Sequence, residues 1–312
     1  MSAIKELMQL LKPDPVEHMR ALMAKGKLAE AIDFSVSIAE NLSSIVKGLT
    51  DQRIQAHAML FEAAARVGDI ASATTHFHRV ELLTKADRLP DEVVEERYFR
   101  ASVAIQQSPM SLKRKHRHMA LIKHLRSVLD LAGEIAECGC YRGLSSWMIC
   151  ATLTEEGGNP DGRPFDGTGY HIFDSFAGLS VPVPEDLPAA DAQDRARLEV
   201  LMQPGRFACS EADVRRHLAG FPGIAYHPGW LPQSLVGEAE RRYRFIHLDV
   251  DLYEPTLGAL EYFYPRLVPG GVMLTDDYGW PGARQAFDEF SARQDLRVEE
   301  LPTEQAVLRK PR

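Results

Sequence analysis

Along the first third of the chain, apolar residues recur every three or four positions, which is the spacing of amphipathic helices. The runs occupy residues 15–25, 28–46, 51–67 and 70–85. Gly26 and Gly68 separate neighbouring runs, at the positions where helices favour glycine as a terminator. The pattern predicts an all-helical N-terminal domain over residues 1–110.

Beyond a further helix expected over residues 111–131, short apolar runs alternate with helical ones, which is typical of a parallel sheet with crossover helices. The expected strands are residues 134–138, 170–173, 224–227, 245–248 and 271–275. Two last runs, 296–301 and 305–309, flank a tight turn and predict an antiparallel hairpin at the sheet edge. Residues 111–312 are therefore expected to form a doubly wound, mostly parallel α/β domain.

The composition is that of an ordinary globular protein, with 45% hydrophobic and 26% charged residues. With 36 basic against 44 acidic residues, the net charge of −8 argues against nucleic acid as the main partner, because binding a polyanion needs a basic face. The one basic run, residues 113–118, is interpreted as the solvated face of a helix. The sequence contains no run of about eighteen apolar residues that would span a membrane. Its four cysteines lack zinc-ligand or disulfide spacing and are expected as reduced thiols of a cytoplasmic protein.

The N-terminal helices admit two interpretations. The stretch over residues 65–83 resembles a tetratricopeptide hairpin, but two such hairpins fall short of the roughly three repeats that a stable solenoid needs. We therefore favour a helical cap or a dimerisation module; in the second case, the protein would be a homodimer joined through these helices.

A glycine-containing turn follows the first expected strand and precedes a helix expected over residues 144–153. Its residues include Glu137, Gly139, Tyr141 and Gly143. Tyr141 stands where a dinucleotide fingerprint needs its middle glycine, which disfavours a pyrophosphate but not a sulfonium amino acid. An acid at the strand end, Glu137, suits a cationic amino-acid ligand and would repel a phosphate. A plain strand-to-helix turn is the alternative.

The second expected strand is followed by Asp174 and Ser175. An acid at this place typically accepts hydrogen bonds from ribose hydroxyls, which makes Asp174 a candidate ligand of an adenosine group. On the local pattern alone, Asp174 is equally suited to cap a following helix. Both roles stay open at this point.

Four aspartates follow the fourth and fifth expected strands: Asp249 and Asp251 after one, Asp276 and Asp277 after the other. Residues i and i+2 of a strand share a face, and the two strands should be neighbours, so the carboxylates are expected to meet at one sheet edge. Unneutralised, they would raise one another's pKa, and His247 is the one basic residue within these segments. A hard divalent cation would relieve the repulsion; all-oxygen ligands favour Mg²⁺, with Mn²⁺ or Ca²⁺ as alternatives. Separate helix caps and salt bridges are the competing interpretation.

Several segments of this domain resemble the macrocin O-methyltransferase (TylF-like) family of S-adenosylmethionine-dependent enzymes. In order along residues 133–291 they are ECGCYRG, FDSFAGLSVPVPED, HPGWLPQSL, HLDVDLYEPT and YPRLVPGGVMLTDDYGWPGARQAFDEF. The resemblance implies a Rossmann-like methyltransferase sheet, S-adenosylmethionine as cofactor, and methyl transfer to a hydroxyl of a sugar or glycosylated natural product. It leaves out the N-terminal helices and does not fix the acceptor, for which a surface-polysaccharide sugar is also open.

The resemblance also implies roles for the aspartates. Asp249, Asp276 and Asp277 are expected as metal ligands, and Asp251 as the general base that takes the acceptor proton. His247 competes with Asp251 as the base, but we rank this role behind that of a packed structural histidine.

The cofactor is expected at the glycine turn and at the end of the second strand. The expected contacts are Glu137, Gly139, Tyr141, Gly143, Asp174, Ser175 and Asp249. By the resemblance, Glu137 and Gly139 would line the methionine part and Asp174 the ribose.

Three further features lie near these segments. Tyr278 and Trp280, which follow the second acid pair, are candidates for stacking on the apolar face of a sugar. The loop over residues 177–201 is rich in proline and acid and is long enough to act as a lid. Trp230 is equally suited to core packing and to substrate contact.

Two other classes of protein compete with the enzyme. A helical-repeat interaction protein with a degenerate methyltransferase domain is disfavoured because a decayed site need not keep four carboxylates. A nicotinamide-dependent oxidoreductase is disfavoured because the middle glycine is absent and neither Tyr141 nor Tyr278 has a lysine four residues on.

Overall fold

The computed structural model describes residues 91–107, 112–157, 164–188, 192–235 and 240–312, together with isolated residues between 18 and 77. The chain divides into two compact units, Met1–Arg114 and Lys115–Arg312. The four helical runs predicted before residue 90 lie largely outside the described residues. The tetratricopeptide and dimer hypotheses therefore stay predictions.

Within the first unit, helix α6 (Glu92–Ala104) is capped by Asp91, whose carboxylate accepts a backbone N–H of the first turn. Phe61, Phe77 and Phe99 pack edge to face, with ring centroids 5.0–5.4 Å apart. These three buried rings give the first unit an aromatic core.

The second unit is built on one seven-stranded sheet with the order β3-β2-β1-β4-β5-β7-β6. The strands are β1 (Glu134–Cys138), β2 (Tyr170–Asp174), β3 (Ala225–Pro228), β4 (Tyr243–Leu248), β5 (Leu267–Thr275), β6 (Glu299–Glu300) and β7 (Ala306–Arg309). The first five pair in parallel, whereas β7 runs antiparallel to β5 and β6. The predicted parallel sheet and its closing hairpin are confirmed, although β6 is much shorter than the expected run.

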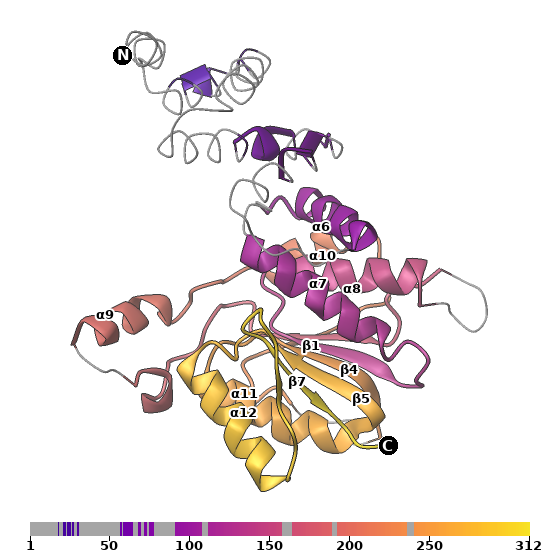
Figure 1. The fold of residues 1–312 in the computed structure, drawn as a ribbon, viewed down its shortest axis with the longest axis vertical. Coiled ribbons are helices and arrows are strands. Elements are labelled where there is room, and N and C mark those ends of the chain that lie inside the picture. The colour runs from indigo at the N-terminus through magenta and orange to yellow at the C-terminus, as the bar shows by residue number, and fades with distance from the viewer. Residues whose placement is uncertain are drawn as a thin grey trace, which may run out of the picture. The chain divides into compact units, whose positions relative to one another are not determined.

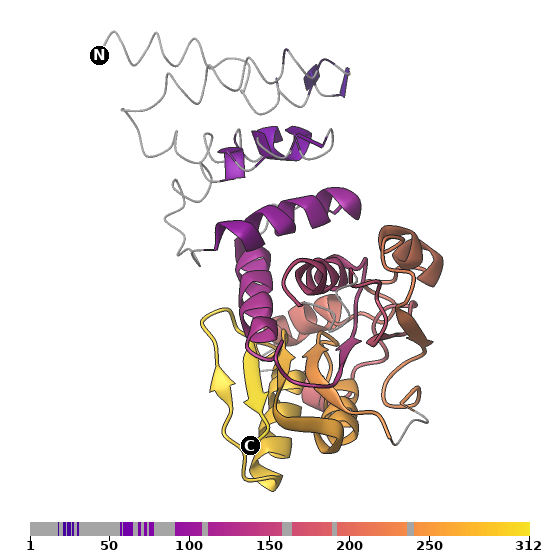
Figure 2. The same ribbon diagram turned by 90° about the vertical axis from the view of Figure 1, so that its right-hand side faces the viewer.

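Helices cover both faces of this sheet. The described helices from α7 onward are α7 (Leu112–Arg126), α8 (Leu144–Glu155), α9 (Ala192–Leu201), α10 (Glu211–His217), α11 (Tyr253–Phe263) and α12 (Pro281–Arg293), with 3-10 turns η1 (Pro184–Asp186) and η2 (Tyr264–Arg266). Figures 1 and 2 show α11 and α12 on one face and α7, α8 and α10 on the other. Because both faces are covered, the central strands are almost continuously buried. No helix in the described parts of the chain is long and apolar enough to cross a membrane.

Successive residues of the central strands face opposite sides of the sheet. In β4, Ile246 and Leu248 belong to the apolar core shared with α11 and α12. His247, between them, lies on the opposite face together with Glu137 of β1, which contacts Ser146 of α8. Two ionisable side chains are thus built into the layer between the sheet and α8.

A long excursion separates β2 from α10, and we call its residues 177–207 the insertion. It contains η1 and α9, and Figure 1 shows α9 standing clear of the sheet. The two ends of the insertion are joined by backbone hydrogen bonds of 2.9 Å, from Leu179 N–H to Arg206 and from Gly205 N–H to Leu179. The insertion is therefore a closed loop with ordered elements, not a plain connection.

Candidate functional site

At the carboxyl edge of the sheet, the glycine turn after β1 lies directly against the loop after β4. The Asp249 N–H donates to the carbonyl of Cys138 over 2.8 Å. Gly139 has a φ of +80°, and a Cβ atom there would overlap the carbonyl oxygen of Asp249. Only glycine fits this position, both for its backbone conformation and for the close approach of the two loops.

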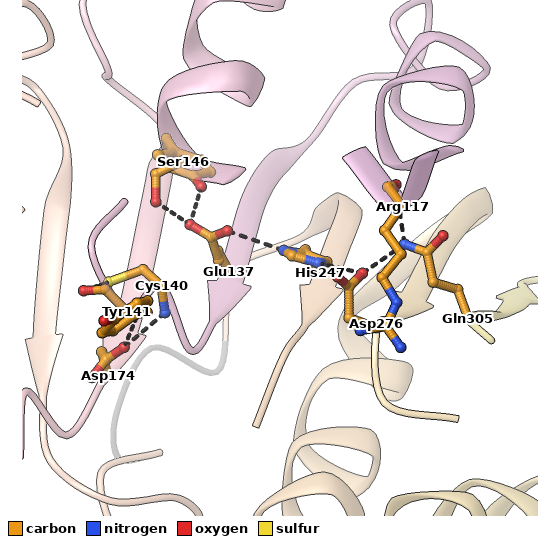
Figure 3. Close-up of polar contacts among 10 residues, drawn as sticks. Arg117, Glu137, Cys140, Tyr141, Ser146, Asp174, His247, Asp276 and Gln305 are labelled. Carbon is orange, nitrogen blue, oxygen red and sulfur yellow. Dashed lines mark hydrogen bonds and ion pairs between the residues drawn. The ribbon is translucent and has the colours of Figure 1, made fainter. Parts of the chain in front are cut away.

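Asp174 holds the glycine turn in place (Figure 3). Its Oδ2 accepts the N–H groups of Cys140 (2.7 Å) and Tyr141 (3.3 Å), and its Oδ1 accepts that of Phe176 (2.7 Å). Residues 175–183 form no helix, so the helix-cap alternative for Asp174 is wrong. A carboxylate has about four acceptor positions, which leaves one for a ribose hydroxyl. The ribose contact stays a prediction.

Three other predicted cofactor residues lie around this turn. The Ser175 hydroxyl donates to the Gly178 carbonyl over 2.7 Å, and Gly143, with φ +91°, begins α8. Tyr141 has a φ of +47°, a conformation that costs energy for a residue with a side chain. Tyr141 is 38% exposed, and its ring meets Phe207 of the insertion edge to face, with centroids 5.6 Å apart. The turn thus presents an aromatic surface to solvent.

Glu137, at the end of β1, is fully buried. It accepts hydrogen bonds from the hydroxyls of Ser146 and Tyr170, the latter over 2.6 Å, and its Oε1 lies 3.0 Å from His247 Nδ1. Burial alone would raise the pKa of this carboxyl, but the hydrogen bond and charge of His247 hold the pKa below its usual value. Since these partners are all internal, contact between Glu137 and a methionine group stays a prediction.

Hydrogen bonds continue from His247 toward β5 and β7 (Figure 3). Its Nε2 lies 3.1 Å from Asp276 Oδ1, which also accepts from Gln305 Nε2 over 2.6 Å. Burial would lower the pKa of His247, but Asp276 and Glu137 raise it well above its usual value. Both ring nitrogens of His247 thus face buried carboxylate oxygens, an arrangement that favours the protonated ring. We call the series Tyr170, Glu137, His247, Asp276 and Gln305 the polar chain.

The acid side of the site consists of Asp249, Asp251 and Asp277, next to Asp276. Strand alternation does not bring the first two together as predicted, because β4 already ends at Leu248 and Asp251 adopts a φ of +60° in the following loop. Burial, and after it the neighbouring carboxylates, raise the pKa of all three, that of Asp251 to about 7. The Asp251 N–H donates to Asp277 Oδ2 over 2.8 Å, so the two acid loops are joined.

Arg117 of α7 supplies positive charge near these carboxylates and acts to lower the pKa of each. Its Nε donates to the Thr303 carbonyl (3.1 Å), and its own carbonyl accepts from Gln305 (3.2 Å). The basic run was predicted as a solvated helix face. That prediction is wrong for Lys115 and His118, which are buried, and for Arg117, which bonds to the turn before β7.

The free oxygens of the acid side suit a hard cation by their chemistry. Within the described part of the chain, neither carboxylate oxygen of Asp249 makes a hydrogen bond, and Asp276 and Asp277 each keep one oxygen without one. Among the described residues, however, no three His, Cys, Asp or Glu side chains converge as a ready-made ligand group. Charge and ligand type fit a divalent cation, and the side chains would have to rearrange to ligate it.

The aromatic residues near the acid loops have different surroundings. Tyr278 is only 5% exposed and its hydroxyl donates to Asp288 over 2.5 Å, so its predicted stacking on a sugar is wrong. Trp280 packs partly buried against an apolar cluster of the insertion. Trp230 is half exposed, and its Nε1–H donates to the Gly178 carbonyl over 3.0 Å. Trp230 therefore lies at the surface, bonded to the start of the insertion, and not in the core.

The strand order with its reversed β7 defines a Rossmann-like methyltransferase sheet, and the two predicted motif groups lie at its carboxyl edge. The model of the macrocin-O-methyltransferase (TylF) family matches residues 69–303, and the chain belongs to this family. The match begins before residue 111, so it extends into the helical region that the resemblance had left out.

Two curated relatives are O-methyltransferases from Streptomyces. The 8-demethyl-8-(2,3-dimethoxy-alpha-L-rhamnosyl)-tetracenomycin-C 4'-O-methyltransferase of Streptomyces olivaceus is 32% identical over 53% of this chain and 60% of its own length. The demethyldecarbamoylnovobiocin O-methyltransferase of Streptomyces niveus is 29% identical over 56% of this chain and 63% of its own. Each match spans less than two thirds of the relative.

One solved structure, that of the O-methyltransferase NovP, resembles this chain in fold. The superposition covers 70% of this chain and 88% of NovP, with 24% identity and a TM-score of 0.51. At this level the likeness supports the fold alone.

Proposed function

We propose that this protein is an S-adenosylmethionine-dependent O-methyltransferase whose acceptor is a hydroxyl of a sugar or glycosylated natural product. Membership of the macrocin O-methyltransferase family supports the reaction class. The acceptor class is supported by the names of the curated relatives, one of which names a compound with a rhamnosyl group.

The cofactor would lie over the glycine turn, on the β1–β2 side of the carboxyl edge. Gly139 lets backbone approach closely there, and Asp174 fixes the turn while keeping one acceptor position for the ribose. Glu137 fixes the end of β1, next to this turn, through its internal hydrogen bonds. Holding both substrates in attack geometry contributes roughly 7–11 kcal/mol to lowering such a barrier.

Asp251 is the general base in this proposal. The observation that carries the assignment is the contrast with His247: both ring nitrogens of His247 are engaged by buried carboxylates, so the ring has no position left to accept a proton. Asp251 is partly exposed at the acid loop, and without a bound cation burial and the neighbouring Asp249 raise its pKa to about 7, close to the optimum for a base that works at neutral pH. It would take the hydroxyl proton as the acceptor oxygen attacks the methyl group.

A divalent cation, Mg²⁺ with Mn²⁺ or Ca²⁺ as alternatives, is the second part of the proposal, held by Asp249, Asp276 and Asp277. When bound, such a cation lowers the pKa of an acceptor hydroxyl and orients it. The residues supply the negative charge: Asp249 offers two carboxylate oxygens, whereas Asp276 and Asp277 offer one each.

Calorimetric titration of the full, chelator-treated chain with S-adenosylmethionine, with and without Mg²⁺, tests both parts. Micromolar binding of the cofactor is expected, with additional heat on adding Mg²⁺. Transfer of a labelled methyl group to a panel of deoxysugar glycosides, rhamnosides among them, then identifies the acceptor. If the folded chain binds no S-adenosylmethionine under either condition, the proposed function is wrong.

A further inference from the structure

The insertion is fixed to the rest of the domain through a buried carboxylate, Asp186, at the end of η1. This residue is 1% exposed. Its Oδ2 accepts the Val183 N–H (2.9 Å) within the insertion, and its Oδ1 accepts the Tyr253 N–H (2.7 Å) outside it. One side chain thus closes the η1 turn and connects the insertion to α11.

The contact with Tyr253 lies at the start of α11, two residues after Asp251. Tyr253 is the first residue of α11, and the N–H groups of a first helical turn have no partner within the helix. Leu252, at the N-cap position, offers no side-chain cap. Asp186 therefore takes over the capping role from another part of the chain, immediately beyond Asp251.

The second acid loop is held from the same side. Gly282 lies in the first turn of α12, which follows the loop of Asp276 and Asp277. A Cβ atom on Gly282 would overlap Asp186 Oδ1 and lie 3.1 Å from its Cα atom. The close packing of Asp186 on this glycine places one carboxylate against the first turns of both helices that follow the acid loops.

Apolar contacts strengthen this attachment. Leu179 and Met202 of the insertion are buried together with Leu252, and Leu187 and Trp280 pack against them. Leu252 follows Asp251, and Trp280 lies shortly after Asp277 in the sequence. The cluster therefore packs against the loops that carry these two aspartates. The insertion is therefore attached beside both acid loops, by these apolar contacts as well as by Asp186.

We propose that Asp186 is a positioning residue for methyl transfer: it docks the insertion on the first turns of α11 and α12 and thereby fixes the loops that carry Asp251 and Asp277. Its role in catalysis rests on the function proposed above. The docking itself does not, because it is defined by the contacts of Asp186 alone. The cofactor side meets the ends of the insertion, at Gly178 and Phe207, and these ends are joined to each other without Asp186. The cofactor side should therefore be insensitive to it.

Four variants separate this role from general stabilisation. Asp186→Ala removes the acceptor of the Tyr253 N–H, whereas Asp186→Asn keeps an oxygen for it. Gly282→Ala disturbs the same contact from the opposite side. Gly220→Ala is its matched control, because a Cβ atom there meets nothing within 4 Å.

Hydrogen exchange of the full chain provides the local measurement, on peptides covering residues 178–188 and 249–257. In Asp186→Ala and Gly282→Ala we expect exchange in both peptides to be at least tenfold faster, because the insertion and the first turn of α11 open together. Exchange in Asp186→Asn and Gly220→Ala should stay within about threefold of the unsubstituted protein. Wild-type exchange over residues 249–257 in Asp186→Ala would overturn the proposal.

Cofactor binding and turnover complete the test. The affinity for S-adenosylmethionine should change less than about threefold in all four variants. With the acceptor found by the labelled-methyl screen, kcat should fall roughly 10–100-fold in Asp186→Ala and recover in Asp186→Asn, since small misplacements of reacting groups have effects of this size. Failure of the unsubstituted chain to bind the cofactor would refute the proposed function, whereas the exchange result would still decide the docking role of Asp186.

Discussion

The carboxylates in the two halves of the carboxyl edge differ in how many hydrogen bonds they accept. On the cofactor side, Glu137 and Asp174 each accept three hydrogen bonds from within the chain. On the acid side, the Asp249 carboxylate accepts none from the described residues. Burial, and after it the neighbouring carboxylates, raise the pKa of Asp249, Asp251 and Asp277. The first pair is structurally satisfied, and the second group is not.

This difference separates carboxylates that mainly hold the backbone in place from carboxylates that are available to bind a ligand or a proton. A carboxylate whose oxygens are mostly taken by internal donors holds backbone in place, and Asp174 keeps one acceptor position for a ligand. Crowded carboxylates without donors are costly in the folded state, and such groups cluster where a ligand or proton is to be bound. The comparison predicts that substitutions on the two sides affect different properties.

The largest effect is expected from Asp251→Asn. Asparagine tolerates the left-handed conformation at this position, so the loop should be preserved while the base is lost. Turnover should fall by about 10²–10⁴-fold, with cofactor affinity within threefold, measured by labelled-methyl transfer and calorimetry. Unimpaired turnover would remove Asp251 from the mechanism.

Next comes Asp276→Asn, which is expected to abolish the response to Mg²⁺ by weakening cation binding at least tenfold. The variant loses a charge at the acid side but keeps an oxygen for Gln305 and His247. Calorimetric titration with Mg²⁺ at saturating cofactor measures it. Asp288→Asn serves as a control, because Asp288 lies on α12 and its carboxylate accepts from Tyr278. An equal loss there would show that the effect is not local.

The mirror-image variant is Asp174→Ala, on the cofactor side. Without its carboxylate, the N–H groups of Cys140 and Tyr141 lose their acceptor, and the glycine turn loosens. Affinity for S-adenosylmethionine should fall about tenfold, which corresponds to roughly 1.4 kcal/mol, while Mg²⁺ binding stays unchanged. A loss of Mg²⁺ binding instead would contradict the division into two halves.

The smallest effect concerns stability. Because the folded-state pKa of Asp251 is raised from 3.8 to about 7, the folded protein disfavours the ionised form. The cost appears as pH rises above about 4 and is complete above pH 7. Asp251→Asn removes this cost. At pH 8 and without cation, the melting temperature of the variant should therefore exceed that of the unsubstituted protein by a few degrees. This shift corresponds to about 1–2 kcal/mol in the free energy of unfolding for a partly exposed group. Below pH 4 the difference should vanish; a difference that persists there has another cause.

The sequence predicted the sheet and the position of the acids well, for a physical reason. Buried parallel strands are short apolar runs, and the residues just beyond them meet at one edge whatever the details of packing. Asp249 and Asp277 could therefore be grouped from the strand pattern alone. Their loops could not be described, because β4 ends at Leu248 and alternation has no meaning beyond a strand end.

Partners across the sheet were not predictable in the same way. Tyr170, Ser146 and Gln305 have no distinguishing local pattern, and they meet Glu137 and Asp276 only because strand order and register bring them together. The same holds for Asp186. Local pattern alone also left the roles of Asp174 open, since an acid after a strand suits a cap, a ligand and a backbone tether equally.

The polar chain also favours the correct pairing register of β1 and β4 when the sheet forms. Glu137 is paired with His247 across β1 and β4, and a slip of one residue would turn His247 to the opposite face. An unpaired carboxylate would then be left in the layer beneath α8, where an uncompensated charge costs several kcal/mol. A purely apolar layer would tolerate such a slip more easily, so the charges that fix Glu137 and Asp276 in the folded state also penalise misaligned sheets.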